Sequence, residues 1–218
     1  AGGRVMDPET GLDAIRNVGI RGERIAEISD APLAGRRRID VSGLVVAPGF
    51  IDLHAHGQTN DANAYQARDG VTTALELEGG VPLIRRWIAS REGRALINYG
   101  ATASQAAARA LAMPENAAAL AAYRQAGGAA GDEAPATLED IVGPSVYKPV
   151  AGQEALRRMD EVLQQALEGG ALGIGLLVGY QPGASWEEIL HLFRFAAMRD
   201  VPIYAHVRDP GVPGIQEM

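Results

Sequence analysis

Short apolar segments alternate with segments of helical pattern along most of the chain. The apolar segments are residues 45–54, 70–75, 95–99, 171–177 and 201–206. The helical patterns are residues 82–91, 153–167 and 186–199. Ser185 is placed to cap the last of these helices, and Gly169-Gly170 to end the one before it. Strands that alternate with helices in this way predict parallel βα units, and therefore an α/β fold.

Two stretches do not follow this alternation. Residues 1–48 combine turn residues at 7–11 with a hairpin pattern at 17–28, which predicts a small antiparallel β unit. Residues 101–150 are rich in Ala, Gly and Pro and lack a strong period. We expect an irregular insertion there, either an excursion over the mouth of a barrel or partly mobile helix. The predicted domains are therefore residues 1–48 and 49–218.

Charge and composition exclude several classes of partner. The 218 residues carry a formal net charge of −7 and lack the basic stripe that phosphate contacts need, so we expect a small-molecule substrate and no nucleic acid partner. No apolar stretch approaches the roughly 20 residues of a membrane helix, so no membrane partner is expected. The chain has no cysteine, so any metal must be bound through nitrogen and oxygen. A cytoplasmic location is favoured, although the first residue is not Met and a removed signal peptide stays open.

A histidine pair ends the first apolar segment. His54 and His56 are two residues apart, so they project from the same face of a strand, together with Asp52. Two imidazoles supply two of the three or more ligands that a catalytic zinc ion needs. The alternative is a pair of strand-end histidines that make ordinary hydrogen bonds, and the spacing alone does not decide between the two.

Further nitrogen and oxygen donors favour the metal site. Glu76 and Glu78 end the second strand on one face, and His206 ends the last strand. Active sites of TIM-type barrels lie at these carboxyl ends of the strands. A solvated strand end is the other explanation for the two glutamates, but inward carboxylates are costly without a cation or hydrogen-bond partners. His191 lies off the apolar stripe of its helix, and we expect it on the surface.

Residues 48–56, Pro-Gly-Phe-Ile-Asp-Leu-His-Ala-His, resemble the first barrel strand of the amidohydrolase superfamily. Within it the chain is most similar to the N-acyl-D-amino-acid deacylase (D-aminoacylase) group, through residues 169–176, 180–183 and 205–208. This resemblance implies a TIM-type (β/α)8 barrel in residues 49–218, with residues 1–48 as part of a small N-terminal β-sandwich. A complete barrel takes roughly 250 residues, so we expect it to be incomplete here and to continue past Met218.

The resemblance also implies roles for individual residues. His54 and His56 would bind one metal ion, and His206 would belong to a second metal position. Tyr180 would polarise the scissile carbonyl or stabilise its oxyanion. Arg208 is a candidate for holding the carboxylate of the substrate.

The chain departs from the superfamily in its oxygen and sulfur ligands. Many members bridge two metals with a carboxylated lysine, and D-aminoacylases use a cysteine after the second strand. Here the only lysine is Lys148, outside the predicted strands, and there is no cysteine. We therefore expect Glu78, or failing that Glu76, to be the oxygen ligand. Asp52 is expected to contact the ligands without binding the metal itself. The expected cofactor is Zn2+, one or two ions, or another divalent metal.

The predicted reaction is hydrolysis of a C–N amide bond in an N-acyl amino acid or dipeptide-like small molecule, by water that a metal ion activates. The alternatives are a cyclic amidase or deaminase of the same superfamily, and a binding or scaffold protein that has lost its chemistry. The superfamily's sixth-strand histidine and catalytic aspartate have no counterpart. We expect both beyond Met218, and residues 1–218 alone to be inactive. The resemblance also implies a homo-oligomer.

Overall fold

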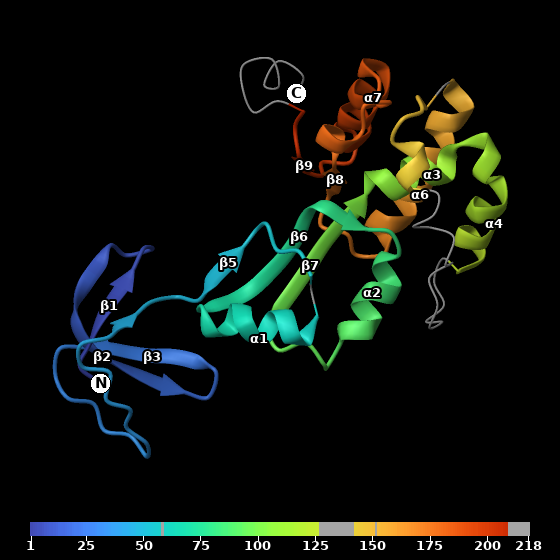
Figure 1. Ribbon diagram of the computed structural model, residues 1–218. Helices are drawn as coiled ribbons and strands as arrows, with labels where there is room; N and C mark the ends of the chain where they lie inside the picture. The colour runs from blue at the N-terminus through green and yellow to red at the C-terminus, as the bar shows by residue number, and fades with distance from the viewer. Residues whose placement is uncertain (58, 127–141, 151, 209–218) are drawn as a thin grey trace. The chain divides into compact units, whose positions relative to one another are not determined.

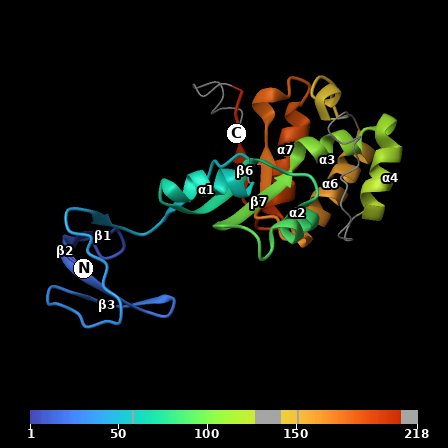
Figure 2. The same cartoon turned by 60° about the horizontal axis from the view of Figure 1, so that its bottom comes forward.

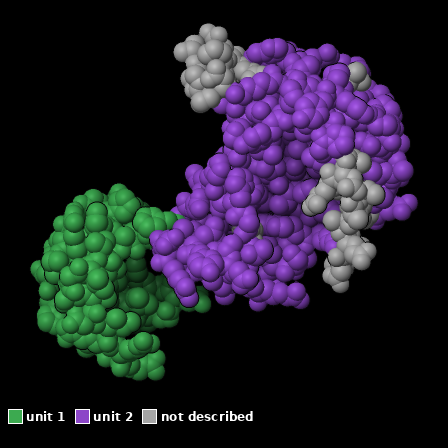
Figure 3. Space-filling model, in the orientation of Figure 1, with its two compact units in different colours: residues 1–50 green, residues 51–218 purple. Residues whose placement is uncertain are grey.

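The computed structural model describes residues 1–57, 59–126, 142–150 and 152–208. The chain divides into two compact units, Ala1–Phe50 and Ile51–Met218, which Figure 3 shows in different colours. This division falls close to the boundary expected after residue 48. None of the helices in the described part of the chain is long and apolar enough to cross a membrane.

The smaller unit is a four-stranded sheet with the strand order β3-β2-β1-β4. Its strands are β1 (Gly3–Asp7), β2 (Leu12–Arg21), β3 (Arg24–Ser29) and β4 (Val45–Val46). The predicted hairpin is confirmed, because β2 and β3 pair antiparallel and Arg21 lies opposite Arg24. Gly22 in the turn has a φ of 62°, in the left-handed region that glycine adopts more readily than other residues. The β-sandwich stays a prediction, because residues 1–50 form one sheet.

The larger unit contains a curled sheet with the strand order β5-β6-β7-β8-β9 (Figures 1 and 2). Its strands are β5 (Phe50–Asp52), β6 (Val71–Val81), β7 (Asn98–Ser104), β8 (Ile174–Leu176) and β9 (Ile203–Ala205). From β6 to β9 each strand pairs in parallel with the next. The predicted parallel α/β architecture is therefore confirmed for this unit.

The predicted strand at residues 45–54 is wrong in its extent. The structure divides it into β4, in the sheet of the smaller unit, and β5, in the parallel sheet. Pro48 and Gly49 lie between them, and a proline cannot donate a hydrogen bond to a neighbouring strand. His54 and His56 consequently follow β5 instead of lying within it.

Three predicted helices are present with nearly the predicted bounds: α2 (Ile84–Arg91), α6 (Gln153–Glu168) and α7 (Trp186–Ala197). The Oγ of Ser185 accepts a hydrogen bond from the backbone N–H of Glu188, so the predicted cap of α7 is confirmed. The N–H of Gly169 donates to the carbonyls of Gln165 and Ala166, and Gly170 has a φ of 104°, as expected of a glycine stop. A helix that was not predicted, α1 (Asn60–Arg68), precedes β6.

Of the two alternatives expected for residues 101–150, helix agrees with the described part, but the segment begins with a strand and is more regular than expected. Residues 101–104 complete β7, and they are followed by α3 (Gln105–Ala112), a 3-10 turn (Pro114–Asn116) and α4 (Ala117–Ala126). In Figures 1 and 2, α3 lies beside α6, with α4 on the outside. All eight residues of α3 are buried, so this helix has no solvent-exposed polar face. The sequence therefore lacks the alternation of polar and apolar residues that marks an amphipathic helix. Residues 127–141 lie outside the described part.

Candidate metal centre

The histidine pair is held by the end of β5. The carboxylate of Asp52 accepts a hydrogen bond from the backbone N–H of His54 over 3.0 Å, which fixes the turn as the chain leaves the strand. The N–H of Ala55 donates to the carbonyl of Leu75 in β6 over 3.0 Å, and the Ala55 side chain is buried. The side chains of His54 and His56, on either side of buried Ala55, are exposed.

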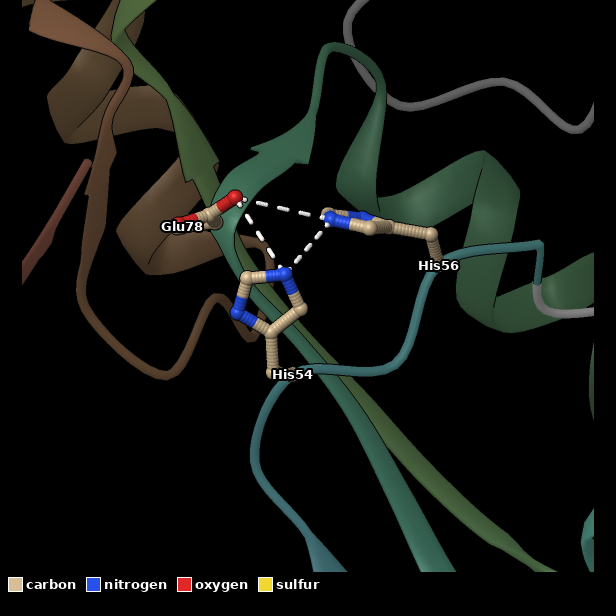
Figure 4. Close-up of side chains that lie close together, drawn as sticks. All are labelled: His54, His56 and Glu78. Atoms are coloured by element: carbon tan, nitrogen blue, oxygen red, sulfur yellow. Dashed lines mark hydrogen bonds and ion pairs between the residues drawn. The ribbon is translucent and has the colours of Figure 1, made fainter. Parts of the chain in front are cut away.

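Three donor atoms converge at this point (Figure 4). The Nε2 atoms of His54 and His56 lie 3.1 Å apart, and the Oε1 of Glu78 lies 3.5 Å from each. Zinc bonds of roughly 2.0–2.2 Å in a tetrahedron place neighbouring donors about 3.3 Å apart. Two imidazoles and one carboxylate with these separations fit a zinc-type ion, with a coordination position to spare.

Glu76 occupies a different place from Glu78. Its Oε2 lies 2.7 Å from the Nδ1 of His56, on the side of the ring opposite to Nε2. Its Oε1 accepts a hydrogen bond from the N–H of Gly79 over 3.3 Å. The structure thus separates two carboxylates that the sequence left interchangeable: one faces the converging nitrogens, and the other lies behind one of the rings.

A β-bulge in β6 produces this separation. The pairing of β6 with β7 shifts register between Glu76 and Val81, which leaves residues 77–80 out of the regular ladder. The hydroxyl of buried Thr102 in β7 donates to the carbonyl of Leu77 over 2.5 Å. Gly80, at the end of the bulge, has a φ of 62°. The ordinary alternation of a strand therefore does not govern where Glu78 points.

Strand β8, on the far side of β7, also shapes the bulge. A Cβ on Gly175 would lie 2.5 Å from the carbonyl oxygen of Leu77 and 2.7 Å from that of Glu78. Only glycine leaves room for the bulge at this position. Sequence reasoning assigned no role to Thr102 or Gly175, because neither residue offers a ligand and the register shift is not visible in the pattern of the strand.

His206 lies on the other side of the Glu78 carboxylate. Its Nδ1 is 3.3 Å from Oε1 and 3.2 Å from Oε2 of Glu78. Its ring stacks on that of Tyr180, with centroids 4.4 Å apart and an interplanar angle of 28°. The backbone N–H of Gly179 also donates to the carbonyl of His206 over 2.7 Å. Glu78 therefore stands between the His54/His56 pair and His206.

The remaining predicted residues lie in different surroundings. One guanidinium nitrogen of Arg208 donates to the backbone carbonyls of Gln181, over 3.2 Å, and of Ala184, over 2.6 Å, so it braces the turn that follows Tyr180. Lys148 lies outside the described strands and pairs with Glu115 at 2.6 Å.

His191, expected on the surface of its helix, has a partner there. It is half-buried on α7 and pairs with Asp160 on α6 at 2.7 Å. This pairing joins two helices away from the three converging donors, so His191 stays outside the candidate metal centre.

Burial and charge differ between the two kinds of donor. The side chains of Glu76 and Glu78 are 12% and 15% exposed, whereas those of His54 and His56 are 63% and 55% exposed. The hydrogen bond with Glu76 raises the pKa of the His56 imidazole. The two carboxylates are thus shielded from solvent, whereas the two imidazoles are accessible to it.

Proteins of known function match almost the whole of this chain. It is 32% identical over 222 residues to a D-aminoacylase of Alcaligenes xylosoxydans xylosoxydans. This alignment covers 97% of this chain and 44% of that protein. It is also 32% identical over 242 residues to an N-acyl-D-glutamate deacylase of the same organism, covering 96% of this chain and 43% of the relative. The predicted similarity to the D-aminoacylase group is therefore confirmed. No protein-family model matches the chain.

A solved amidohydrolase has the same fold. The structure of N-acyl-D-glutamate deacylase from Bordetella bronchiseptica, complexed with zinc and a phosphonate inhibitor, matches with a TM-score of 0.73 at 24% identity. The match covers 100% of this chain and 47% of that one. This likeness shows that the chain has the fold of that deacylase, and the curled parallel sheet of the larger unit is consistent with part of a TIM-like barrel. The chain spans less than half the length of the curated relatives that it matches.

Proposed function

We propose that the protein hydrolyses a C–N amide bond in a small molecule, an N-acyl amino acid or a dipeptide-like compound, with the help of a divalent metal ion. The observation that carries this proposal is the convergence of two imidazole nitrogens and one carboxylate oxygen, 3.1–3.5 Å apart, at the carboxyl ends of barrel strands. The relatives named D-aminoacylase and N-acyl-D-glutamate deacylase support the same class of reaction.

The proposed metal ligands are His54, His56 and Glu78. A divalent ion at this place would lower the pKa of a water toward about 7 and polarise a carbonyl oxygen. Glu78 also contacts His206, and this contact supports a second metal position between that histidine and the carboxylate. Zn2+ is the proposed ion, because the donors are nitrogen and oxygen at tetrahedral spacing.

Two further residues are proposed to act on the substrate. The Tyr180 side chain is exposed and stacks on His206, which supports a role for its hydroxyl as a donor to a carbonyl oxygen of the substrate. Arg208 is two residues from His206, and its guanidinium is oriented by the carbonyls of Gln181 and Ala184. We propose that it holds the carboxylate of an N-acyl amino acid.

Metal content and a hydrolysis screen test the proposal together. The purified full-length protein is expected to contain a transition metal. After zinc is supplied, it is expected to release amino acids from N-acetyl and N-acyl amino acids of one chirality. His54→Ala and Glu78→Ala should each lose the metal. His191→Gln is the matched control, because this histidine pairs with Asp160 away from the site, and it should keep the metal and the activity.

Other outcomes identify the rival functions. Opening of hydantoin-like rings, or release of ammonia from aminated heterocycles, without hydrolysis of linear amides would assign a cyclic amidase or a deaminase. A full-length protein that binds no transition metal and hydrolyses none of these compounds with zinc present would be a scaffold, and the proposal would be wrong.

A further inference from the structure

The structure assigns Glu76 as a positioning residue: its carboxylate holds the His56 ring in the tautomer that leaves Nε2 free to bind the metal ion. This inference rests on the proposed function, because it concerns how the same site is prepared. It gives the second glutamate of β6 a role that differs from ligation.

The hydrogen bond itself decides which ring nitrogen carries the proton. An ionised carboxylate can only accept hydrogen bonds. The Oε2 of Glu76 lies 2.7 Å from the Nδ1 of His56, and this contact favours the tautomer with the proton on Nδ1. In a neutral imidazole the other nitrogen then has the lone pair. For His56 that nitrogen is Nε2, which is the atom that faces His54 and Glu78.

Glu76 is itself held rigidly enough to act in this way. Its side chain is 12% exposed, and its Oε1 accepts from the N–H of Gly79 within the bulge. The side chain of His56, in contrast, is 55% exposed, and its Nδ1 is held by the Glu76 carboxylate. Carboxylate partners of metal-bound histidines typically contribute about 10–100-fold to metal affinity.

Two variants of Glu76 test the assignment with two measurements. The first is the tautomer of His56 in the metal-free protein, read from long-range ¹H–¹⁵N correlation spectra at a pH where the imidazole is neutral. The second is zinc affinity, measured by competition with a chelating dye. Glu76→Ala should shift the His56 population from the Nδ1–H to the Nε2–H tautomer and weaken zinc binding by about 10–100-fold.

Glu76→Gln keeps the size of the side chain but replaces one acceptor by a donor. We expect an intermediate shift of the tautomer and an intermediate loss of affinity, with the protein folded. This variant keeps the assignment testable if Glu76→Ala disturbs the bulge through the lost bond to Gly79.

Thr102→Val is the control for an indirect effect through the backbone. It removes the hydroxyl that supports the carbonyl of Leu77 without touching His56. The tautomer of His56 should stay as in the wild type. A tautomer that is unchanged in both Glu76 variants, or one that shifts equally in Thr102→Val, would overturn the assignment.

The two hypotheses fail in different ways. If the wild-type protein binds no zinc, the proposed function is wrong, and the metal-free spectra still report whether Glu76 sets the tautomer. If the wild type binds zinc and the Glu76 variants bind it equally well, the proposed function stands and the positioning role is wrong.

Discussion

Arg109 and Glu188 form an ion pair whose two side chains are fully buried, between α3 and α7. The Nε of Arg109 donates to Oε1 of Glu188 over 2.9 Å, and its other two nitrogens bond the backbone carbonyls of Ser145 and Lys148. Gln105 adds a bond to the same Glu188 oxygen over 3.0 Å. Burial raises the pKa of the Glu188 carboxyl, and the Arg109 charge opposes that rise. This one arginine therefore joins three stretches of chain that are distant in sequence.

Glu188→Ala should lower the free energy of unfolding by about 3–5 kcal/mol, because the guanidinium of Arg109 would stay buried without its counter-charge. Urea unfolding followed by circular dichroism measures the change. Glu187→Ala, at the exposed neighbouring position, is the matched control and should stay within about 0.5 kcal/mol of the wild type. Equal, small effects of the two substitutions would show that the ion pair does not stabilise the fold.

Tyr180→Phe tests the proposed role of the phenol hydroxyl. The ring and its stacking on His206 are kept, so zinc content should be unchanged. Loss of a hydrogen-bond donor to a developing oxyanion typically lowers kcat by about 10²–10³-fold. Steady-state kinetics of the full-length protein on its preferred N-acyl amino acid measure this. A kcat equal to that of the wild type would exclude the hydroxyl from the reaction.

At the scale of elements, the bulge of β6 determines the arrangement of the site. Its four residues carry Glu78 away from the regular ladder. Thr102 in the adjacent strand β7 donates a hydrogen bond to the bulge, and Gly175 in β8, the next strand along, leaves room for it. The geometry of the candidate metal centre is therefore a property of three successive strands and not of the histidine motif alone.

Gly175→Ala should disturb the bulge. The new Cβ would lie 2.5 Å from the carbonyl oxygen of Leu77 and 2.6 Å from Oγ1 of Thr102, so backbone must move. We expect a loss of about 1–3 kcal/mol in the free energy of unfolding, together with weaker zinc binding. Gly143→Ala is the control, because a Cβ there meets nothing within 4 Å. Zinc affinity and stability equal to those of Gly143→Ala would contradict this account.

Elements with local signals were predictable from the sequence. Helices α6 and α7 could be placed because a glycine pair ends the first and a serine caps the second. Helix α3 could not be placed, because Gln105 and Arg109 are buried among alanines and give no polar face. Their partner Glu188 is 79 residues or more away in the sequence, and no local pattern reveals that pairing.

The same distinction applies to the site. His54 and His56 could be predicted as a pair because their spacing and the residues before them are local features. The different placement of Glu76 and Glu78 could not, because alternation along a regular strand puts both on one face. Their separation depends on a register shift that neighbouring strands impose.

At the scale of the whole molecule, the two units differ in how much core they have. Within residues 1–50, all of which the structure describes, Val5 is the only hydrophobic side chain that is buried. Several isoleucines of its sheet are exposed, among them Ile15, Ile20 and Ile25. The larger unit, by contrast, has a continuous core built from its sheet and from helices α3, α6 and α7.

A fragment of residues 1–50 should therefore not fold by itself, because a sheet with one buried hydrophobic side chain cannot offset the entropy of ordering its backbone. We expect no cooperative thermal transition in circular dichroism and poorly dispersed amide resonances. A sigmoidal, reversible transition of the isolated fragment would contradict this expectation.

The segment Gly179–Tyr180 contacts His206 at two points, through the stacking of the Tyr180 ring on the imidazole and through the bond between the Gly179 N–H and the His206 carbonyl. A molecule that displaces the phenol ring removes the stacking partner of the imidazole. If His206 binds a cation, as proposed, thermodynamic linkage requires that this molecule and the cation change each other's affinity by the same factor. Titrating either one at several fixed concentrations of the other would reveal this reciprocity.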